Sequence, residues 1–413
     1  MEFDILFLGC LFPREKEAEI KSKMKTGMAD AANALQWNLI DGFDENDCGT
    51  VKILNYLPVG SYPRNYLEPS LPRFVFQHTQ KYRSDDINVG GTNRSVIKHF
   101  INICPFWKEV KKWVKQRSDK KKVIVSYTAS PMFLSLAKRA KTRDPKICVA
   151  CVIADLPEFA NLSRLSGLRK LYNRYYAARA RKLYASVDCF VVLTKQMVDK
   201  LRITVPYTVV EGIASDLDAP CDNTLAKQYE NEKYILYTGT LNPQFGIMTL
   251  LEAFSQIKVP DMKLMICGFG EAEQQILQMQ QNDPRIIYLG KVDRKAVLPL
   301  QRGATVLVNP RQNNEEFTKY SFPSKTMEYL ASGVPVVAYK LDGIPDEYDE
   351  YLNYVEDNSA QSLADKLVQI CEMDEASRAE MGKRGADFVM KNKNAVVQTR
   401  RILEFINETC NPG

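Results

Sequence analysis

The sequence predicts an α/β protein made of two doubly wound, mainly parallel sheets in two domains. The chain has 413 residues, which is too long for one compact core and suits two domains of roughly 200 residues each. Apolar strand-like runs alternate with helical stretches along both halves, the pattern of parallel sheets covered by helices. A polar segment from Glu211 to Glu232 interrupts this alternation and is typical of a linker.

The first domain, residues 1–215, contains six short apolar runs that predict strands and four longer periodic stretches that predict helices. The expected strands are Ile5–Leu8, Val51–Leu54, Val123–Tyr127, Ile147–Ile153, Cys189–Leu193 and Tyr207–Val210. The expected helices are Gly27–Leu39, Arg94–Val114, Met132–Ala140 and Leu168–Ala185.

The second domain, residues 216–395, repeats the alternation with the strand-like runs YILYTG, KLMICG, RIIYLG, TVLVNP and VPVVAY. Residues 396–413 are expected to form a helix that packs back toward the first domain. Two such domains around a linker form a cleft, and ligands bind beyond the carboxyl ends of the strands.

The composition favours a cytoplasmic protein. The N-terminal apolar run is short and predicts a buried strand rather than a signal peptide. No later segment approaches the roughly 18 uncharged apolar residues of a membrane span. The ten cysteines are scattered. Cys148 and Cys151 form a CxxC in an apolar run, where packed thiols on opposite faces of a strand are favoured over a metal or redox site.

The segment FPSKTMEYL, from Phe322 to Leu330, predicts a helix with both ends marked. Phe322 precedes a proline and is expected to be extended. Pro323 fits the first helical position, and Gly333 fits the position just past the end.

Ser324, Lys325 and Glu328 lie within one turn of this helix and can share a face. The helix start and Lys325 suit a phosphate, and Glu328 suits the two hydroxyls of a ribose. A capped amphipathic helix with a surface Lys–Glu pair is the structural alternative.

The stretch KYSFPSKTMEYLASGVPVVAY resembles the signature of family 4 glycosyltransferases, in the branch that builds capsular and exopolysaccharides. YTGTLNPQFGIMTLLEAF, KLMICGFGEAEQQI, IIYLGKVDRKAVLPLQRGATVLVNP, GIPDEY and VVLTKQMVDKL extend the resemblance over roughly residues 187–347. The resemblance implies a GT-B fold, with two Rossmann-like domains facing across a cleft. It also implies a nucleotide-diphosphate sugar donor, no required metal or cofactor, and retention of anomeric configuration.

The chain departs from the family at the first of two glutamates. Glu328 matches the second, which the resemblance implies binds the donor ribose. Tyr320 stands where the first is expected. Glu315 and Glu316 lie nearby and are alternative carboxylates, although a solvated loop explains them equally well.

A second departure concerns the Arg and Lys that neutralise the donor diphosphate in the family. Thr240 and Phe245 occupy those positions. Stabilising charge on the leaving group is the main task of such an enzyme, and Lys325 and Arg311 are the candidates, with backbone N–H groups at Gly239–Thr240. Pairing of Arg311 with Glu315 or Glu316 is its alternative role.

The expected donor-binding set is Gly239, Thr240, Gly268, Arg311, Tyr320, Ser321, Phe322, Ser324, Lys325 and Glu328. Asp155 follows a strand of the first domain and is a candidate for sugar contact or general-base work, with a helix cap as its alternative. Together with Lys325 and Arg311, Asp155 completes the expected catalytic set. Gly9, Tyr62 and Arg64 are expected on the acceptor side. His78 and His99 match no family position, and His99 is expected to be structural.

Charge is distributed unevenly. Residues 1–215 hold 35 Lys and Arg against 21 Asp and Glu, whereas the rest holds 21 against 29. Residues 107–122 and 164–184 combine basic side chains with aromatic ones, which suits an anionic membrane surface. Solvated amphipathic core helices are the alternative. No nucleic-acid recognition motif is present, so the first domain is expected at the inner face of the cell membrane.

The resemblance, together with the basic first domain, implies a retaining glycosyltransferase that moves a sugar from a UDP-sugar to a lipid-linked or polysaccharide acceptor. Two other functions stay open. A binding or regulatory partner with the same fold would explain the departures at Tyr320, Thr240 and Phe245. A nucleotide-sugar epimerase would need neither a lipid acceptor nor the basic stretches.

Overall fold

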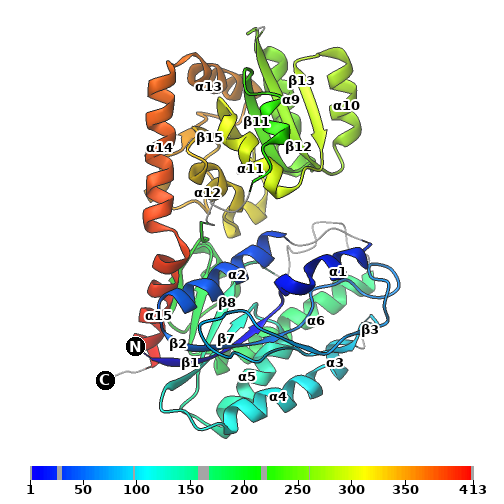
Figure 1. The fold of residues 1–413 in the computed structure, drawn as a ribbon, viewed down its shortest axis with the longest axis vertical. Helices are drawn as coiled ribbons and strands as arrows, with labels where there is room; N and C mark the ends of the chain where they lie inside the picture. The colour runs from blue at the N-terminus through cyan, green and yellow to red at the C-terminus, as the bar shows by residue number, and fades with distance from the viewer. Residues whose placement is uncertain are drawn as a thin grey trace. The chain divides into compact units, whose positions relative to one another are not determined.

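The computed structural model describes residues 2–25, 30–95, 98–156, 167–214, 221–259 and 261–410, without the side chains of residues 99–100 and 168–170. The chain divides into two compact units (Figure 1). Unit 1 comprises Met1–Ile213 with Ala395–Gly413, and unit 2 comprises Ala214–Asn394. Residues 395–410 therefore belong with the first half of the chain.

Unit 1 is built on an eight-stranded sheet in the order β10-β9-β8-β7-β1-β2-β5-β4. Its strands are β1 (Phe3–Gly9), β2 (Gly49–Asn55), β4 (Phe74–Phe76), β5 (Asp86–Asn88), β7 (Lys121–Tyr127), β8 (Cys148–Ile153), β9 (Cys189–Val192) and β10 (Tyr207–Val209). All neighbours pair in parallel except β4 and β5, which are antiparallel. A separate pair is formed by β3 (Ser70–Leu71) and β6 (Gly91–Thr92). The parallel centre confirms the predicted sheet, and the antiparallel edge was not foreseen.

The helices of unit 1 are α1 (Glu17–Ser22), α2 (Asp30–Glu45), α3 (Lys98–Ile101), α4 (Ile103–Lys115), α5 (Pro131–Arg143), α6 (Gly167–Leu183), α7 (Gln196–Leu201) and α15 (Ala395–Cys410). The prediction of one helix over residues 94–114 was wrong, because the chain breaks at Asn102. The Asn102 side chain accepts a hydrogen bond from Thr92 N (3.1 Å) and donates one to Thr92 O (3.0 Å), which ties the break to β6.

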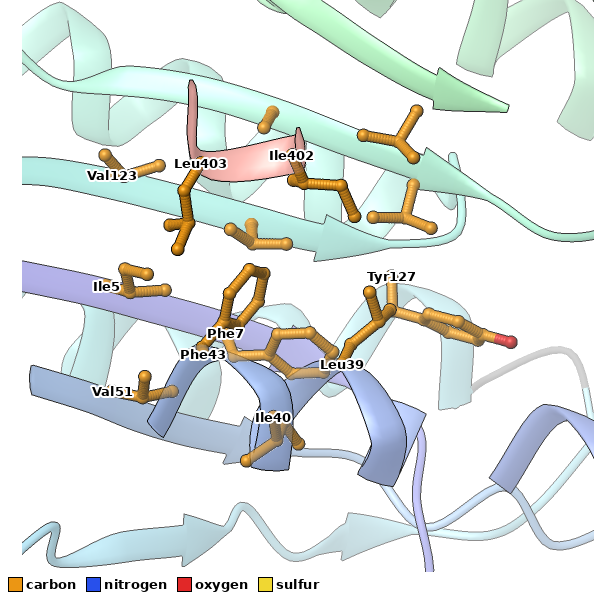
Figure 2. Close-up of a cluster of buried hydrophobic side chains, with 14 of the residues drawn as sticks. Ile5, Phe7, Leu39, Ile40, Phe43, Val51, Val123, Tyr127, Ile402 and Leu403 are labelled. Atoms are coloured by element: carbon orange, nitrogen blue, oxygen red, sulfur yellow. The ribbon is translucent and has the colours of Figure 1, made fainter. Parts of the chain in front are cut away.

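The apolar core of unit 1 lies between the sheet and the helices α2 and α15. Figure 2 shows Phe43 of α2 and Leu403 of α15 against Ile5 and Phe7 of β1. Alternate residues of each strand point to this face, and they are almost fully buried. The last helix of the chain thus covers the same face of the sheet as α2.

One cysteine prediction was wrong. Cys148 was expected to be a free thiol in the core, but it is joined by a disulfide to Cys410 at the end of α15. Cys151 remains free and buried, and it lies on the opposite face of β8, as predicted from strand alternation. The 262 residues that separate Cys148 from Cys410 explain why no local pattern indicated the pair.

Unit 2 is built on a six-stranded, fully parallel sheet in the order β13-β12-β11-β14-β15-β16. Its strands are β11 (Lys233–Thr240), β12 (Met262–Phe269), β13 (Ile286–Gly290), β14 (Val306–Asn309), β15 (Val336–Ala338) and β16 (Asn353–Tyr354). Its helices are α8 (Thr224–Lys227), α9 (Ile247–Gln256), α10 (Glu273–Asn282), α11 (Arg294–Gly303), α12 (Ser324–Ala331), α13 (Ala360–Glu372) and α14 (Glu375–Asn392). The short α8 lies inside the segment predicted to be a linker.

Each sheet reverses its strand order once, and this position locates the candidate sites. In unit 1 the chain starts at β1, adds strands on the β2 side, and then returns to place β7 on the other side of β1. In unit 2 it starts at β11, adds β12 and β13, and then returns to place β14 beside β11. Ligands of such sheets bind at this switch point, beyond the carboxyl ends of the strands.

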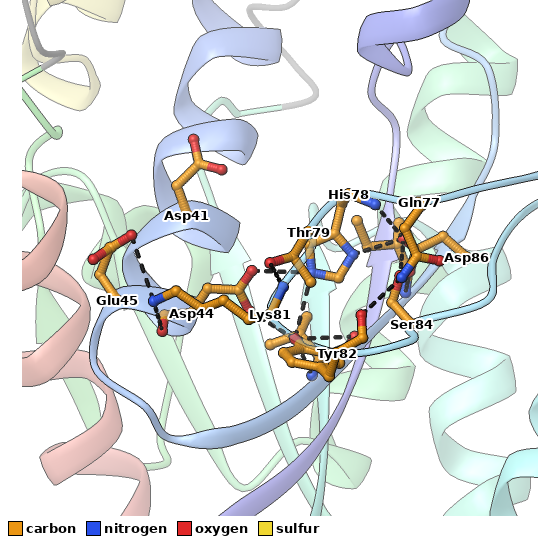
Figure 3. Close-up of polar contacts among 12 residues, drawn as sticks. Asp41, Asp44, Glu45, Gln77, His78, Thr79, Lys81, Tyr82, Ser84 and Asp86 are labelled. Carbon is orange, nitrogen blue, oxygen red and sulfur yellow. Dashed lines mark hydrogen bonds and ion pairs between the residues drawn. The ribbon is translucent and has the colours of Figure 1, made fainter.

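A buried ionic cluster holds the loop between β4 and β5 of unit 1 against α2 (Figure 3). The His78 side chain is fully buried, and its ring nitrogens contact Asp86 Oδ2 (2.6 Å) and Asp44 Oδ2 (3.3 Å). Tyr82 Oη donates a hydrogen bond to Asp44 Oδ1 (2.7 Å). Burial alone would lower the pKa of His78, but the hydrogen bonds to Asp44 and Asp86 outweigh it and raise this pKa to about 9.

The raised pKa predicts a pH-dependent stability. The protonated His78 stabilises the fold fully below its unfolded pKa of about 6.5, and the contribution is lost as the pH rises through about 9. His78→Gln leaves two buried carboxylates without a cation, so we expect a loss of about 3 kcal/mol at pH 6. Denaturant unfolding at pH 6 and pH 10 measures the loss, which should shrink at the higher pH. Arg83→Gln, an exposed change in the same loop, should have little effect at either pH.

Candidate functional site

Helix α12 begins beside the switch point of unit 2 and ends close to where the sequence predicts. The helix begins at Ser324, one residue later than predicted. Pro323 is therefore the N-cap residue and not the first residue of the helix. Gly333 follows the helix with a φ of 77°, a left-handed conformation that glycine adopts without strain. The expected boundaries are thus correct to within one residue.

The buried hydroxyl of Tyr329 attaches α12 to the end of β11. It accepts a hydrogen bond from Thr238 N (2.7 Å) and donates one to Thr238 O (3.0 Å). Tyr329 is 1% exposed, so both bonds are shielded from water. These bonds consequently fix the position of the next two residues of β11, Gly239 and Thr240, relative to the helix.

Glu328 lies at the centre of a small polar cluster. Its Oε1 accepts hydrogen bonds from Lys325 Nζ (2.7 Å) and from Gln301 Nε2 (2.7 Å), and Arg294 Nε lies 3.9 Å from Oε2. Burial would raise the pKa of Glu328, but the charge of Lys325 and the hydrogen bonds from Gln301 and Lys325 hold it below the ordinary value. The carboxylate is therefore ionised at neutral pH.

The alternative of a solvated Lys–Glu pair describes this cluster only in part. Lys325 and Glu328 do form an ion pair in the unliganded protein, with side chains 38% and 17% exposed. However, Glu328 is also bonded to Gln301, which is fully buried and donates to Thr238 Oγ1 (3.1 Å) as well. The carboxylate is thus held on its buried side by Gln301, and Lys325 is the partner nearer to solvent.

Arg311 follows β14 and is held by aromatic rings. Its guanidinium carbon lies 4.5 Å from the ring centroid of Phe317 and 5.6 Å from that of Phe245. Its Nη2 donates a hydrogen bond to Ser321 Oγ (2.6 Å). Cation–π contacts of this kind fix the direction of a guanidinium group while its charge is retained. The structure thus brings together two of the expected residues, Arg311 and Ser321.

The strand ends at this site approach each other closely. Gly239 and Gly268 are paired in register on β11 and β12, and a Cβ added at Gly268 would lie 1.8 Å from Gly239 O. A Cβ at Gly246 would lie 1.9 Å from Pro310 O, next to Arg311. The glycines therefore permit the packing of the loops that carry the polar groups.

Three further residues of the expected donor-binding set differ from one another in how far they are buried. Phe322 is 6% exposed and packs on Tyr348 at 5.2 Å between ring centroids, so its side chain belongs to the core of unit 2. Tyr320 ends a 3-10 helix of residues 316–320 and is partly exposed. Ser324 is exposed at the start of α12. For Phe322, the expected contact with a donor is thus limited to the backbone.

In unit 1 a cavity of about 140 Å³ lies at the switch point. It is lined by Cys10, Phe12, Ala32, Asn33, Gln36, Pro58, Tyr127, Thr128, Ala154 and Asp155. Asp155 is the one expected site residue among them, and Gly9 directly precedes Cys10. The alternative of Asp155 as a helix cap concerns residues 157–160, which lie outside the described part of the chain.

Tyr62 and Arg64 do not line this cavity, and their acceptor-side role stays a prediction. Both are exposed in the segment that joins β2 to β3, where the peptide bond between Tyr62 and Pro63 is cis. The sequence analysis missed Tyr127 and Thr128. Their position at the carboxyl end of β7, next to β1, is the signal by which they could have been found.

The two basic stretches differ in the structure. Val110 and Trp113 of α4 are 0% and 2% exposed, so the apolar stripe of residues 107–122 forms core, as the structural alternative held. On α6, by contrast, Leu171 and Tyr175 are 64% and 54% exposed, and Arg174 between them is exposed too. No helix in the described part of the chain is both long and apolar enough to cross a membrane.

Residues 232–373 match the sequence family described as glycosyl transferases group 1. The chain is 28% identical over 176 residues to N-acetyl-alpha-D-glucosaminyl L-malate synthase of Bacillus anthracis, covering 40% of this chain and 43% of that protein. It is 31% identical over 151 residues to phosphatidyl-myo-inositol mannosyltransferase of Mycobacterium tuberculosis, covering 34% and 39%. The matched segments thus span less than half the length of either relative.

Solved structures extend the similarity to both units. The sucrose-phosphate synthase of Thermosynechococcus elongatus aligns with 99% of each chain, at a TM-score of 0.65 and 16% identity. The Anabaena protein HepE in complex with UDP aligns with 99% of this chain and all of its own, at a TM-score of 0.61 and 13% identity. The fold is therefore GT-B, with two Rossmann-like units, as predicted.

Proposed function

We propose that the protein is a retaining glycosyltransferase that moves a sugar from a UDP-sugar to a lipid-linked or polysaccharide acceptor. The observation that carries the proposal is the cluster in which Glu328 of α12 is bonded to Lys325 of the same helix and to Gln301 of α11. This cluster lies within the segment that matches glycosyl transferases group 1. The UDP in the HepE complex supports the choice of nucleotide.

The cluster suits the two ends of a nucleoside diphosphate. The ionised carboxylate of Glu328 accepts hydrogen bonds from the two ribose hydroxyls. The free N–H groups at the start of α12 and the ammonium of Lys325 bind phosphate oxygens. Because Gln301 retains its bond to Glu328, Lys325 can turn to the diphosphate without leaving the carboxylate unbonded.

Arg311 compensates for the departures at Thr240 and Phe245. Phe245 provides an aromatic face in place of the expected lysine, and Arg311 places its guanidinium over that face. A cation from the loop after β14 thus supplies the charge that the loop after β11 lacks. Arg is well suited to this task because its planar fork binds two phosphate oxygens at once.

In the proposed transfer, the bond between the sugar C1 and the phosphate oxygen breaks, and a bond from C1 to the acceptor oxygen forms on the same face. The acceptor proton passes to the departing phosphate oxygen. Lys325, Arg311 and the start of α12 stabilise the negative charge that develops on the diphosphate, which is the step where preorganised charge has the largest effect. Capsular or exopolysaccharide synthesis is the process that we propose for this reaction.

Glu328→Ala tests the nucleotide site. Removing hydrogen bonds to a charged group costs about 1.5–3 kcal/mol, so we expect UDP to bind roughly 10- to 100-fold more weakly by calorimetry. Asp387→Asn, which breaks an exposed Lys–Asp pair of α14, serves as the matched control and should bind UDP normally. Wild-type protein that binds no uridine nucleotide would refute the proposal, and binding without sugar transfer or hydrolysis would favour the regulatory partner.

Arg311→Ala tests the origin of the diphosphate charge. It should weaken UDP binding roughly 10- to 100-fold and leave uridine binding unchanged, because uridine has no phosphate. Adding Phe245→Lys to Arg311→Ala should restore much of the UDP affinity. Arg285→Ala removes another arginine that stacks on a phenylalanine of unit 2 and should leave both ligands unaffected. Equal loss of uridine and UDP would show that Arg311 supports only the fold of the site.

We further propose that α6 of unit 1 binds an anionic membrane surface and brings the enzyme to its acceptor. Leu171, Arg174 and Tyr175 are exposed on one side of this helix, and such a basic face with interfacial apolar groups suits anionic lipid headgroups. The relative named phosphatidyl-myo-inositol mannosyltransferase supports a lipid acceptor.

Leu171→Ser combined with Tyr175→Ser should reduce co-sedimentation with phosphatidylglycerol vesicles several-fold at low salt, because it removes the apolar part of the contact. Leu277→Ser, an exposed apolar position on α10, is the matched control. If the wild-type protein does not sediment with the vesicles, or if the double variant sediments equally well, α6 is not the contact.

A further inference from the structure

A buried phenol projects into the cavity of unit 1 without a partner. Tyr127, the last residue of β7, is 2% exposed, and its Oη has no hydrogen-bond partner among the described residues. Figure 2 shows its oxygen pointing away from the apolar cluster that holds the rest of the side chain. Buried polar groups in native proteins are almost always bonded, so an unbonded one calls for an explanation, and for Tyr127 the adjoining cavity offers room for a ligand that would supply the bond.

The loop of residues 10–12, of which Cys10 and Phe12 line the cavity, already has its N–H groups bonded. Side chains occupy the N–H and C=O groups of residues 10–12, the loop after β1. The bonds are Cys10 N to Gln36 Oε1 (2.7 Å), Gln36 Nε2 to Cys10 O (2.6 Å), Leu11 N to Asn55 Oδ1 (2.8 Å), Asn55 Nδ2 to Leu11 O (2.9 Å), Phe12 N to Asn33 Oδ1 (2.9 Å) and Trp37 Nε1 to Phe12 O (3.2 Å). The N–H groups of this loop are therefore already bonded, whereas the hydroxyl of Tyr127 is available to a ligand.

Backbone strain marks the same position. Thr128 has a φ of 76°, which is rare for a residue with a branched side chain. Its N–H donates to Val152 O (2.8 Å), and its C=O accepts from Ser126 Oγ (2.9 Å). Strained residues that are held in this way cluster at functional sites. The two bonds keep the end of β7, and with it Tyr127, in a fixed orientation.

The charge of the lining selects the type of ligand. Among the described lining residues there is no Lys, Arg or His, and Asp155 is acidic. Burial raises the pKa of the Cys10 thiol to about 12, so it stays neutral. A phosphate or carboxylate would thus find no cation among the lining residues that the structure describes, although residues 1–215 as a whole are basic. The volume of about 140 Å³ is close to the roughly 150 Å³ of an engineered cavity that holds one benzene ring.

We propose that this cavity is a subsite for one uncharged, hydroxyl-bearing ring, and that Tyr127 is the residue that selects it by a hydrogen bond to a ring hydroxyl. The proposal rests on the proposed function, in which this ring is the part of the acceptor that receives the sugar. The ring that binds in this cavity would then be a neutral sugar or cyclitol and not a sugar phosphate.

The test uses the full chain with saturating UDP, so that the phosphate site of unit 2 is filled. Methyl α-D-glucopyranoside, methyl α-D-mannopyranoside, myo-inositol and glucose 6-phosphate are the probes, and saturation-transfer NMR measures their binding. We expect at least one neutral probe to bind the wild type and Tyr127→Phe to weaken it roughly tenfold. Tyr354→Phe, which changes a buried phenol in unit 2, is the control and should bind it normally.

Stability separates a binding role from a structural one. Because Tyr127 Oη makes no bond in the described protein, Tyr127→Phe should leave the melting temperature unchanged or raise it. The inference is overturned if no neutral probe binds, if Tyr127→Phe binds as the wild type does, or if glucose 6-phosphate binds more tightly in a Tyr127-dependent way. If separate calorimetry showed that the protein does not bind UDP, that result would contradict the proposed function instead.

Discussion

The hydroxyl of Tyr329 sets the geometry on which the proposed donor site depends. It forms hydrogen bonds with both backbone groups of Thr238. These bonds fix the position of helix α12 along β11 and its rotation about its own axis. Glu328 precedes Tyr329 in the helix, so its carboxylate is directed to Gln301 by the same attachment. Without these two bonds the helix would be held by apolar packing and by the hydrogen bonds that Glu328 and Thr326 accept from Gln301 and Asn309.

The two switch points use buried polar groups in opposite ways. In unit 1 the loop after β1 has its backbone groups bonded by side chains such as Gln36 and Asn55, so this wall is rigid and offers little to a ligand. In unit 2 the cluster at α12 includes the charged side chains of Lys325 and Glu328, which are 38% and 17% exposed. In the proposed function the site in unit 1 takes a neutral ring and the site in unit 2 takes a diphosphate, so each half of the chain would bind a different substrate.

The sequence predicts the features that local patterns encode. The parallel strands are continuous apolar runs, and Pro323 and Gly333 mark the ends of α12, so the fold and this helix could be foreseen. The break at Asn102 could not, because it arises from hydrogen bonds to Thr92. The periodicity around Trp113 indicates an apolar face but not whether protein or lipid covers it. The stacking of Arg311 on two rings joins loops that follow different strands, and only the folded chain brings them together.

The assignment of α15 to unit 1 determines the order in which the protein can fold during synthesis. Unit 2 is an insertion whose two ends meet, because Ala214 N donates to Lys393 O (2.7 Å). It can complete its core before the chain reaches Ala395. The sheet of unit 1, although synthesised first, must wait for Ile402 and Leu403 to cover one face. At the usual rate of translation this delay is roughly 10 to 40 s, during which an apolar surface stays open to chaperones. The N-terminal half is thus the last to be finished.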